Sequence, residues 1–102
     1  MRMLVFFDLP VTTKAEPRCA SQFRKFLLDD GYYMVQFSVY ARLCSNMESA
    51  VGHEKKLRAV APKNGSIRVM IVTEKQYADM HVLCGEKKID EEEVECYQLS
   101  FF

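Results

Sequence analysis

The sequence lacks the cysteine and histidine spacing of a structural metal site. Its four cysteines include no pair separated by two residues, so a zinc-binding fold is not expected. A glycine-rich phosphate loop and a serine, histidine and aspartate set are also missing. The chain therefore carries none of the motifs that identify the common nucleotide-binding proteins or serine hydrolases.

Long apolar runs are missing as well. No stretch approaches the roughly 18 apolar residues of a membrane span, and the run Met3–Phe7 is too short for a signal peptide and lacks a small-residue cleavage site. We therefore predict a soluble, cytoplasmic protein whose thiols are reduced. A length of 102 residues predicts one compact domain over residues 1–102. Such a small domain gains stability from a dimer interface.

An excess of charge of either sign is also lacking, because 14 basic residues balance 14 acidic ones. This balance argues against a protein coated with basic surface. The charges are uneven along the chain, however. Most of the Lys and Arg lie between residues 14 and 68, and acidic residues crowd positions 90–95. The acidic run is either a solvated turn or a docking point for a basic partner.

Hydrophobic patterning predicts the first half of the fold. Met3–Phe7 is a continuous apolar run typical of a central strand. A helix is expected from about Pro17 to Gly31, and its buried stripe comprises Ala20, Phe23, Phe26 and Leu27. Strict alternation over Tyr32–Leu43 predicts one long strand with a buried face and a second, semi-polar face.

The second half is predicted in the same way. Asn46 can cap a helix over Met47–Ala61, which Pro62 ends. The residues of this helix expected to face the core are Ala50, Val51, Leu57 and Val60. Ser66–Thr73 reads as a third strand, and shorter strands are expected at His81–Cys84 and Val94–Phe102.

These elements predict an α+β, ferredoxin-like βαββαβ-type sandwich with an added C-terminal strand. Right-handed crossovers place both helices on one face of the sheet. The other face needs a cover, and we predict a homodimer interface there. Tyr32, Met34 and Tyr40 are assigned to that interface, since aromatic and methionine side chains are enriched at interfaces. Stacking of the two tyrosines on unpaired bases is an alternative.

Three segments resemble strands of the second CRISPR-associated protein family. Met3–Pro10 is similar to its opening strand with an aspartate just past it, Gln36–Tyr40 to its second strand, and Ser66–Val69 to its third. The matches occur in the family's order and extend to about residue 83. The resemblance implies a homodimer whose sheets pair face to face. It also implies that the dimer bridges the CRISPR integrase and holds a short DNA duplex for spacer acquisition in antiviral defence.

The resemblance further implies metal-dependent nuclease activity in some members, with Asp8 as a metal ligand and catalytic residue. A carboxylate just beyond a buried strand lies where ligands collect, and Asp8 from two subunits could share Mg²⁺ or Mn²⁺. The bound ion would polarise a phosphate or activate water. The alternative is a turn aspartate that caps nearby backbone amides.

Basic residues near Asp8 and along the first helix form the predicted nucleic-acid-binding set, which neutralises phosphates without reading bases. The set comprises Lys14, Arg18, Arg24, Lys25, Arg42, Lys63 and Arg68. For each of these residues alone, an ordinary solvated surface position is the competing interpretation.

We rank a DNA-binding scaffold above hydrolysis, because two-metal nuclease sites need several carboxylates and no second acid lies near Asp8 in the sequence. The alternative is a magnesium-dependent endonuclease acting on RNA or DNA through Asp8 of both subunits. A third possibility is a small RNA-binding module of the same fold. It is disfavoured because Arg68, Met70 and Val72 stand where aromatic residues would be required.

Overall fold

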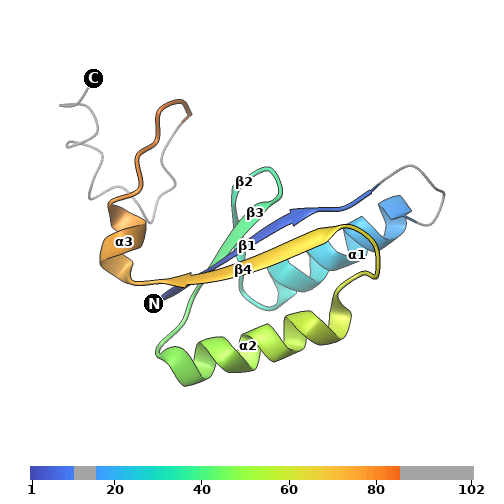
Figure 1. Ribbon diagram of the computed structural model, residues 1–102, viewed down its shortest axis with the longest axis horizontal. Coiled ribbons are helices and arrows are strands. Elements are labelled where there is room, and N and C mark those ends of the chain that lie inside the picture. Colours follow the sequence, from blue (N-terminus) through green and yellow to red (C-terminus); the bar gives the residue numbers. More distant parts are fainter. Residues whose placement is uncertain (11–15, 86–102) are drawn as a thin grey trace. The chain divides into compact units, whose positions relative to one another are not determined.

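A computed structural model describes residues 1–10 and 16–85. Its elements are β1 (Arg2–Asp8), α1 (Glu16–Asp29), β2 (Tyr33–Gln36), β3 (Val39–Leu43), α2 (Met47–Val60), β4 (Ser66–Val72) and α3 (Glu74–Ala78) (Figure 1). The chain divides into two compact units, Met1–Val72 and Thr73–Phe102. The first unit contains the sheet with α1 and α2. The single domain expected for the whole chain stays a prediction.

The sheet has the strand order β2-β3-β1-β4, and every neighbouring pair is antiparallel. Val5, in the middle of β1, pairs with Tyr40 on one side and Val69 on the other. Strand β2 therefore runs parallel to β1 with β3 between them, and β3 runs parallel to β4 with β1 between them. These two interleaved βαβ units are the ferredoxin-like arrangement, which confirms the predicted fold class.

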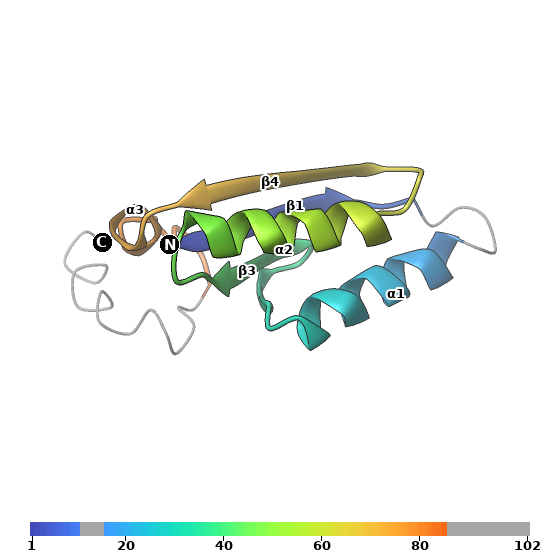
Figure 2. The same ribbon diagram turned by 90° about the horizontal axis from the view of Figure 1, so that it is seen from below.

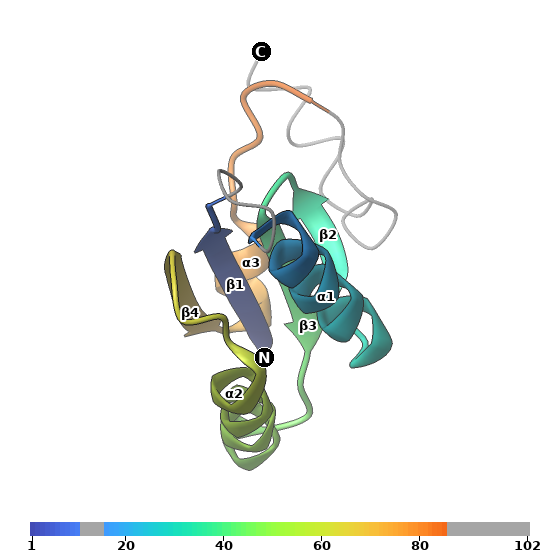
Figure 3. The ribbon, with the colours of Figure 1, turned by 90° about the vertical axis from the view of Figure 1, so that its right-hand side faces the viewer.

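Both helices of this unit pack on one face of the sheet (Figures 2 and 3). The core contains the odd-numbered residues of β1 together with side chains from both helices, and its members are Met3, Val5, Phe7, Phe23, Leu27, Tyr32, Tyr40, Cys44, Ala50 and Leu57. Phe7 contacts two aromatic rings of this core. Its ring meets Phe23 edge-on at 5.3 Å between centroids and stacks on Tyr40 at 5.6 Å.

The predicted long strand over Tyr32–Leu43 is wrong. The segment is a hairpin of β2 and β3, and its turn places Ser38 at a φ of 63°. The alternation of apolar residues continues through the turn, so periodicity alone did not reveal it. Residues of a two-residue hairpin turn often adopt such left-handed conformations, because these match the strand twist.

The hairpin also corrects the predicted dimer interface. Tyr32 and Tyr40 are 3% and 4% exposed and belong to the core beneath the helices. Met34 is 44% exposed, yet it pairs with Tyr40 and so faces the helix side of the edge strand. None of the three residues lies on the face of the sheet that the helices leave open.

The two helices confirm part of what the sequence predicts about their buried residues and caps. In α1 the expected residues Ala20, Phe23 and Leu27 are buried. In α2, Asn46 caps the first turn by accepting a hydrogen bond of 2.8 Å from the Ser49 amide. Val51, however, is exposed, because it lies about 100° around the helix from buried Ala50. Val60, in the last turn, is exposed too.

The second unit begins with Thr73, whose side chain and backbone exchange capping-box hydrogen bonds with Gln76 at the start of α3. The strand predicted at His81–Cys84 is wrong, since these residues form no ladder. The strand predicted at Val94–Phe102 and the acidic run at 90–95 lie outside the described residues. Within residues 1–10 and 16–85, no helix has the length and apolar character needed to span a bilayer.

Candidate nucleic-acid and metal site

Asp8 is the last residue of β1, and its side chain is exposed. It pairs with Ser66, the first residue of β4. Because side chains alternate along a strand, Asp8 belongs to the same face as Leu4 and Phe6, away from the helices. The structure thus places this carboxylate at the end of the sheet, beside its open face.

The turn between α2 and β4 packs directly against Asp8. Gly65 has a φ of 102°, and a Cβ built on it would lie 2.6 Å from the Asp8 carbonyl oxygen. The same atom would lie 3.0 Å from Pro10 Cδ and 3.0 Å from Leu9 Cδ2. Only glycine adopts this conformation at such a close approach, so the turn fixes the path of the chain as it leaves β1.

Replacing Gly65 with alanine should therefore lower the free energy of unfolding by about 1–3 kcal/mol, through left-handed strain and the clash with Asp8. The matched control is Gly52→Ala, since a Cβ at Gly52 meets nothing within 4 Å. Alanine at this interior helix position should stabilise the protein by about 0.5–1 kcal/mol. Urea denaturation of both variants measures the two effects. A change in the free energy of unfolding that has the same sign in both variants would contradict the packing described above.

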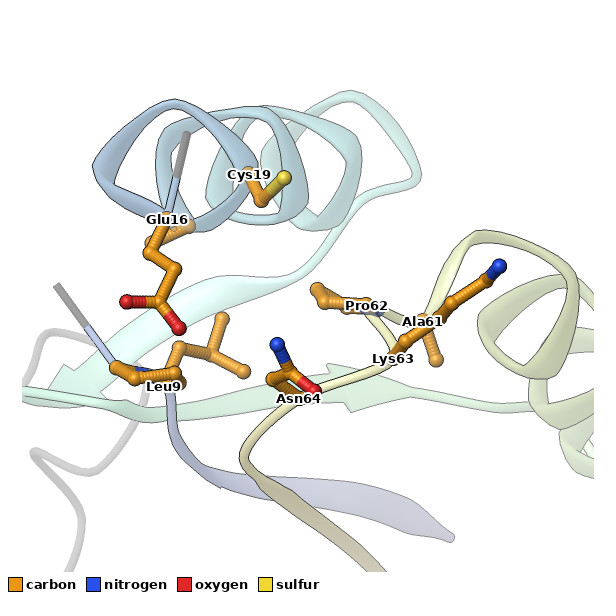
Figure 4. A pocket seen from close by; sticks show the side chains of 9 residues that line it. Leu9, Glu16, Cys19, Ala61, Pro62, Lys63 and Asn64 are labelled. Carbon is orange, nitrogen blue, oxygen red and sulfur yellow. The ribbon is translucent and has the colours of Figure 1, made fainter. Parts of the chain in front are cut away.

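A pocket opens beside this turn, on the helix side of the sheet. It has a volume of about 410 Å³ and lies between the chain leaving β1, the first turns of α1 and the connection from α2 to β4 (Figure 4). The lining residues are Leu9, Pro10, Glu16, Cys19, Ala20, Ala61, Pro62, Lys63 and Asn64. Sequence reading missed this pocket, because its walls come from three segments far apart in the chain.

The donor set at Asp8 decides how well a magnesium site fits. Within the described part of the chain, no three residues of the His, Cys, Asp and Glu types gather closely enough to hold a metal ion. Magnesium needs only one or two carboxylates and otherwise keeps water ligands or takes phosphate oxygens. Asp8 of one chain would supply one carboxylate to such a site, and Asp8 of a second copy would supply the other.

The predicted phosphate-binding residues are scattered rather than gathered on one rim of the chain. Lys63 lies exposed in the turn beside Asp8, and Arg18 is exposed near the start of α1. Arg68 is exposed on the open face next to Phe6. These three lie nearest the Asp8 end of the sheet. Their role in binding nucleic acid stays a prediction.

The remaining members of the set lie elsewhere. Arg42 pairs with Met3, five residues before Asp8, which is roughly 16 Å away along the strand. Its guanidinium donates a hydrogen bond of 2.8 Å to the Leu43 carbonyl. Arg24 is half-buried and Lys25 is exposed on α1, and Lys14 lies outside the described residues.

A polar cluster that sequence reading missed lies at the opposite end of the sheet from Asp8. The Asp30 carboxylate lies 2.7 Å from His53 Nδ1 and 3.4 Å from Lys56 Nζ. These two contacts connect the end of α1 to α2. Burial raises the pKa of the nearby Tyr32 hydroxyl and Cys44 thiol, so both stay neutral at physiological pH. The sequence signal that could have identified His53 is its position three residues after Ala50, because residues at this spacing lie on the same side of a helix. The cluster is a packing feature remote from Asp8.

The open face of the sheet is largely apolar. By strand alternation it carries Leu4, Phe6, Val39, Ala41, Leu43, Met70 and Val72, with Arg2, Tyr33 and Arg68 among them. Arg2 donates a hydrogen bond to the Tyr33 hydroxyl across this face. Leu43 on β3 and Met70 on β4 are 55% and 52% exposed, whereas Leu4 and Ala41 on the same face are buried. Large apolar side chains left exposed on a sheet face are typical of protein interfaces.

Comparisons with known proteins agree with one another. A family model described as CRISPR associated protein Cas2 matches residues 1–80. A protein of Acidovorax ebreus (strain TPSY) named CRISPR-associated endoribonuclease Cas2 is 50% identical over 102 residues, 100% of each chain. A protein of the same name from Flavobacterium psychrophilum is 48% identical over 88 residues, 86% of this chain and 76% of its own. The crystal structure of Streptococcus pyogenes Cas2 at pH 6.5 matches with a TM-score of 0.63 and 25% identity, covering 82% of this chain and 100% of its own.

Proposed function

Because the chain belongs to the CRISPR-associated Cas2 family, we propose that it acts as a homodimeric scaffold in spacer acquisition. The dimer binds duplex DNA and bridges subunits of the CRISPR integrase. The observation that carries this proposal is the apolar open face of the sheet, where Leu43 and Met70 stay more than half exposed in one chain. A second copy packed on this face would bury those side chains.

Two-fold symmetry would place each basic surface residue twice on the assembly. A dimer of this kind repeats each surface on both sides of one axis, so Lys63 and Arg18 of each subunit lie at corresponding places on the assembly. Paired basic positions of this kind suit the contact of a duplex backbone at two separated points. Phosphate contacts fix the position of a duplex without reading its sequence, as a protein that accepts many different spacers requires.

A second candidate function is that of a metal-dependent endoribonuclease. It is supported by the exposed Asp8 at the end of β1 and by the printed names of the relatives. In this proposal, Asp8 of each subunit holds Mg²⁺, which supplies charge stabilisation at a phosphate and an activated water. The chain's own part is to hold Asp8 in place, and the Gly65 turn packed against its backbone does this.

The scaffold proposal is tested by assembly in solution. Light scattering after size-exclusion chromatography should give a dimer for the purified protein, and a larger complex when the cognate integrase and duplex DNA are added. Cells that carry the integrase but lack this gene should acquire no spacers, and the wild-type gene should restore acquisition. A protein that stays monomeric with both partners present, or cells that acquire spacers equally without the gene, would refute the proposal.

A further inference from the structure

The pocket beside Asp8 has the size and chemistry of a small-ligand site. Its volume of about 410 Å³ lies within the range of about 300–1,000 Å³ that such sites span. Most of its wall is apolar and comes from Leu9, Pro10, Ala20, Ala61 and Pro62. The two proline rings supply flat, rigid surfaces on the chain leaving β1 and on the chain leaving α2.

Polar groups stand on two sides of the pocket: Lys63 and Asn64 on the α2–β4 turn, and Glu16, whose carboxylate points in from the first turn of α1 (Figure 4). The Asn64 amide points into the space bounded by Leu9 and Pro62, whereas the Lys63 side chain extends outward along the rim (Figure 4). An amide carries both hydrogen-bond donors and an acceptor, which is the combination that the edge of a nucleobase demands. A lysine ammonium binds phosphate as a point charge.

The pocket is joined to Asp8 by a rigid connection. Leu9 and Pro10, which line it, directly follow Asp8 in the chain. On the other side, the turn containing Asn64 ends at Gly65, which has room for no Cβ against the Asp8 carbonyl oxygen. The backbone of Asp8 and this wall of the pocket therefore hold a fixed spacing, with Asp8 beside the open face and the pocket on the helix side of the same end of the sheet.

We propose that this pocket takes one unpaired nucleobase of a single-stranded nucleic acid whose backbone passes Asp8. The base lies between the proline rings, the Asn64 amide contacts its edge, and Lys63 contacts the adjoining phosphate. This inference rests on the proposed binding of nucleic acid at the Asp8 end of the sheet. A paired base is excluded from the pocket, because bases in a duplex are stacked and must be flipped out to enter a site of this kind.

Cys19 provides a reporter for occupancy, because its exposed thiol lines the pocket. The test uses the full chain with Cys84→Ser and Cys96→Ser, which leaves buried Cys44 as the only other thiol. Cys44 has a raised pKa and therefore reacts slowly. Asp8→Asn is added so that no ligand is cleaved. The rate of Cys19 modification by a thiol reagent is then measured with four probes of equal length: single-stranded RNA, single-stranded DNA, an abasic strand and duplex DNA.

Single-stranded probes that carry bases should slow the modification of Cys19 severalfold, whereas the abasic strand and the duplex should leave it unchanged. Equal protection by the abasic strand would assign the contact to phosphate and overturn the proposal. Protection by neither base-carrying probe would overturn it too. This readout is independent of the dimer and duplex assembly that test the scaffold, and of the cleavage that tests the nuclease.

Asn64→Ala should lower the affinity for single-stranded RNA by about tenfold, as expected for a lost contact to a base edge. It should also weaken the preference among the four bases at one position of the probe. The matched control is Gln22→Ala, because Gln22 is an exposed amide on α1 outside the pocket. Ala61→Phe, which fills the pocket from an exposed position, should have the same effect as Asn64→Ala. Unchanged affinity in both pocket variants would contradict the proposal.

Discussion

A dimer held by the open face of the sheet should dissociate when Met70 is replaced by aspartate. Met70 lies on β4, pairs with Leu4 of the central strand, and is 52% exposed in one chain. In the monomer the new carboxylate can reach water from this half-exposed position, so the free energy of unfolding should fall by about 1 kcal/mol, as expected for an aspartate within a strand. In the dimer it would be buried without a partner, which is strongly unfavourable for a charge. Sedimentation equilibrium should therefore show a folded monomer.

The matched control for this variant is Met47→Asp on α2. Met47 is 49% exposed, almost the same as Met70, but it lies in the first turn of α2 and not on the sheet. This variant should remain a dimer. A Met70→Asp protein that stays dimeric, or a Met47→Asp protein that becomes monomeric, would place the interface elsewhere. Spacer acquisition in cells should follow the oligomeric state of each variant.

Aspartate at Tyr40 would be a poor test of the same dimer, although sequence patterning assigned Tyr40 to the interface. Its ring stacks on Phe7 within the core, at 5.6 Å between centroids. A charge at this position would therefore unfold the chain rather than separate two chains. The error arose at the hairpin turn around Ser38, because an alternating pattern carries no mark of a turn when the residues of the turn continue the alternation.

The central strand and the bounds of α2 followed from strong local signals. Five apolar residues in a row predicted the central strand, and Asn46 with Pro62 bounded α2 closely. Such features act within a few residues, so a single sequence shows them. The exposure of Val51 depends instead on which side of α2 meets the sheet, and the spacing of apolar residues along that helix did not define this side.

The candidate site likewise has one part that a local sequence pattern predicts and another part that only the tertiary structure shows. Asp8 was identified because an acidic residue followed a buried strand, which is a local pattern. The pocket beside it needs Leu9, Cys19 and Asn64 to come together from three segments, and only the tertiary structure does this. The predicted nucleic-acid-binding set was chosen by charge alone, and charge does not say where a residue lies in the fold. Arg42, for example, pairs with Met3 at the far end of the sheet from Asp8.

Asp8→Asn should abolish metal-dependent cleavage of RNA while leaving the scaffold intact. Asparagine keeps the shape of the side chain and can still accept a hydrogen bond in a turn, but it loses the negative charge that a magnesium ion requires. We expect the cleavage rate to fall by about two orders of magnitude or more. Dimerisation and duplex binding should be unchanged, since Asp8 is exposed. Cleavage is measured with purified protein, a single-stranded RNA and added Mg²⁺.

The control is Asp29→Asn, which removes one exposed carboxylate at the end of α1 and should cleave like the wild type. Cleavage that survives in Asp8→Asn would remove Asp8 from the chemistry and point to a contaminating nuclease. The same pair of variants separates the two proposed functions in cells. If Asp8→Asn supports spacer acquisition, the scaffold works without hydrolysis, and Asp8 serves a separate reaction. If acquisition stops although the dimer and the duplex complex persist, the carboxylate is needed within the scaffold itself, because asparagine preserves every contact of Asp8 except those that depend on its charge.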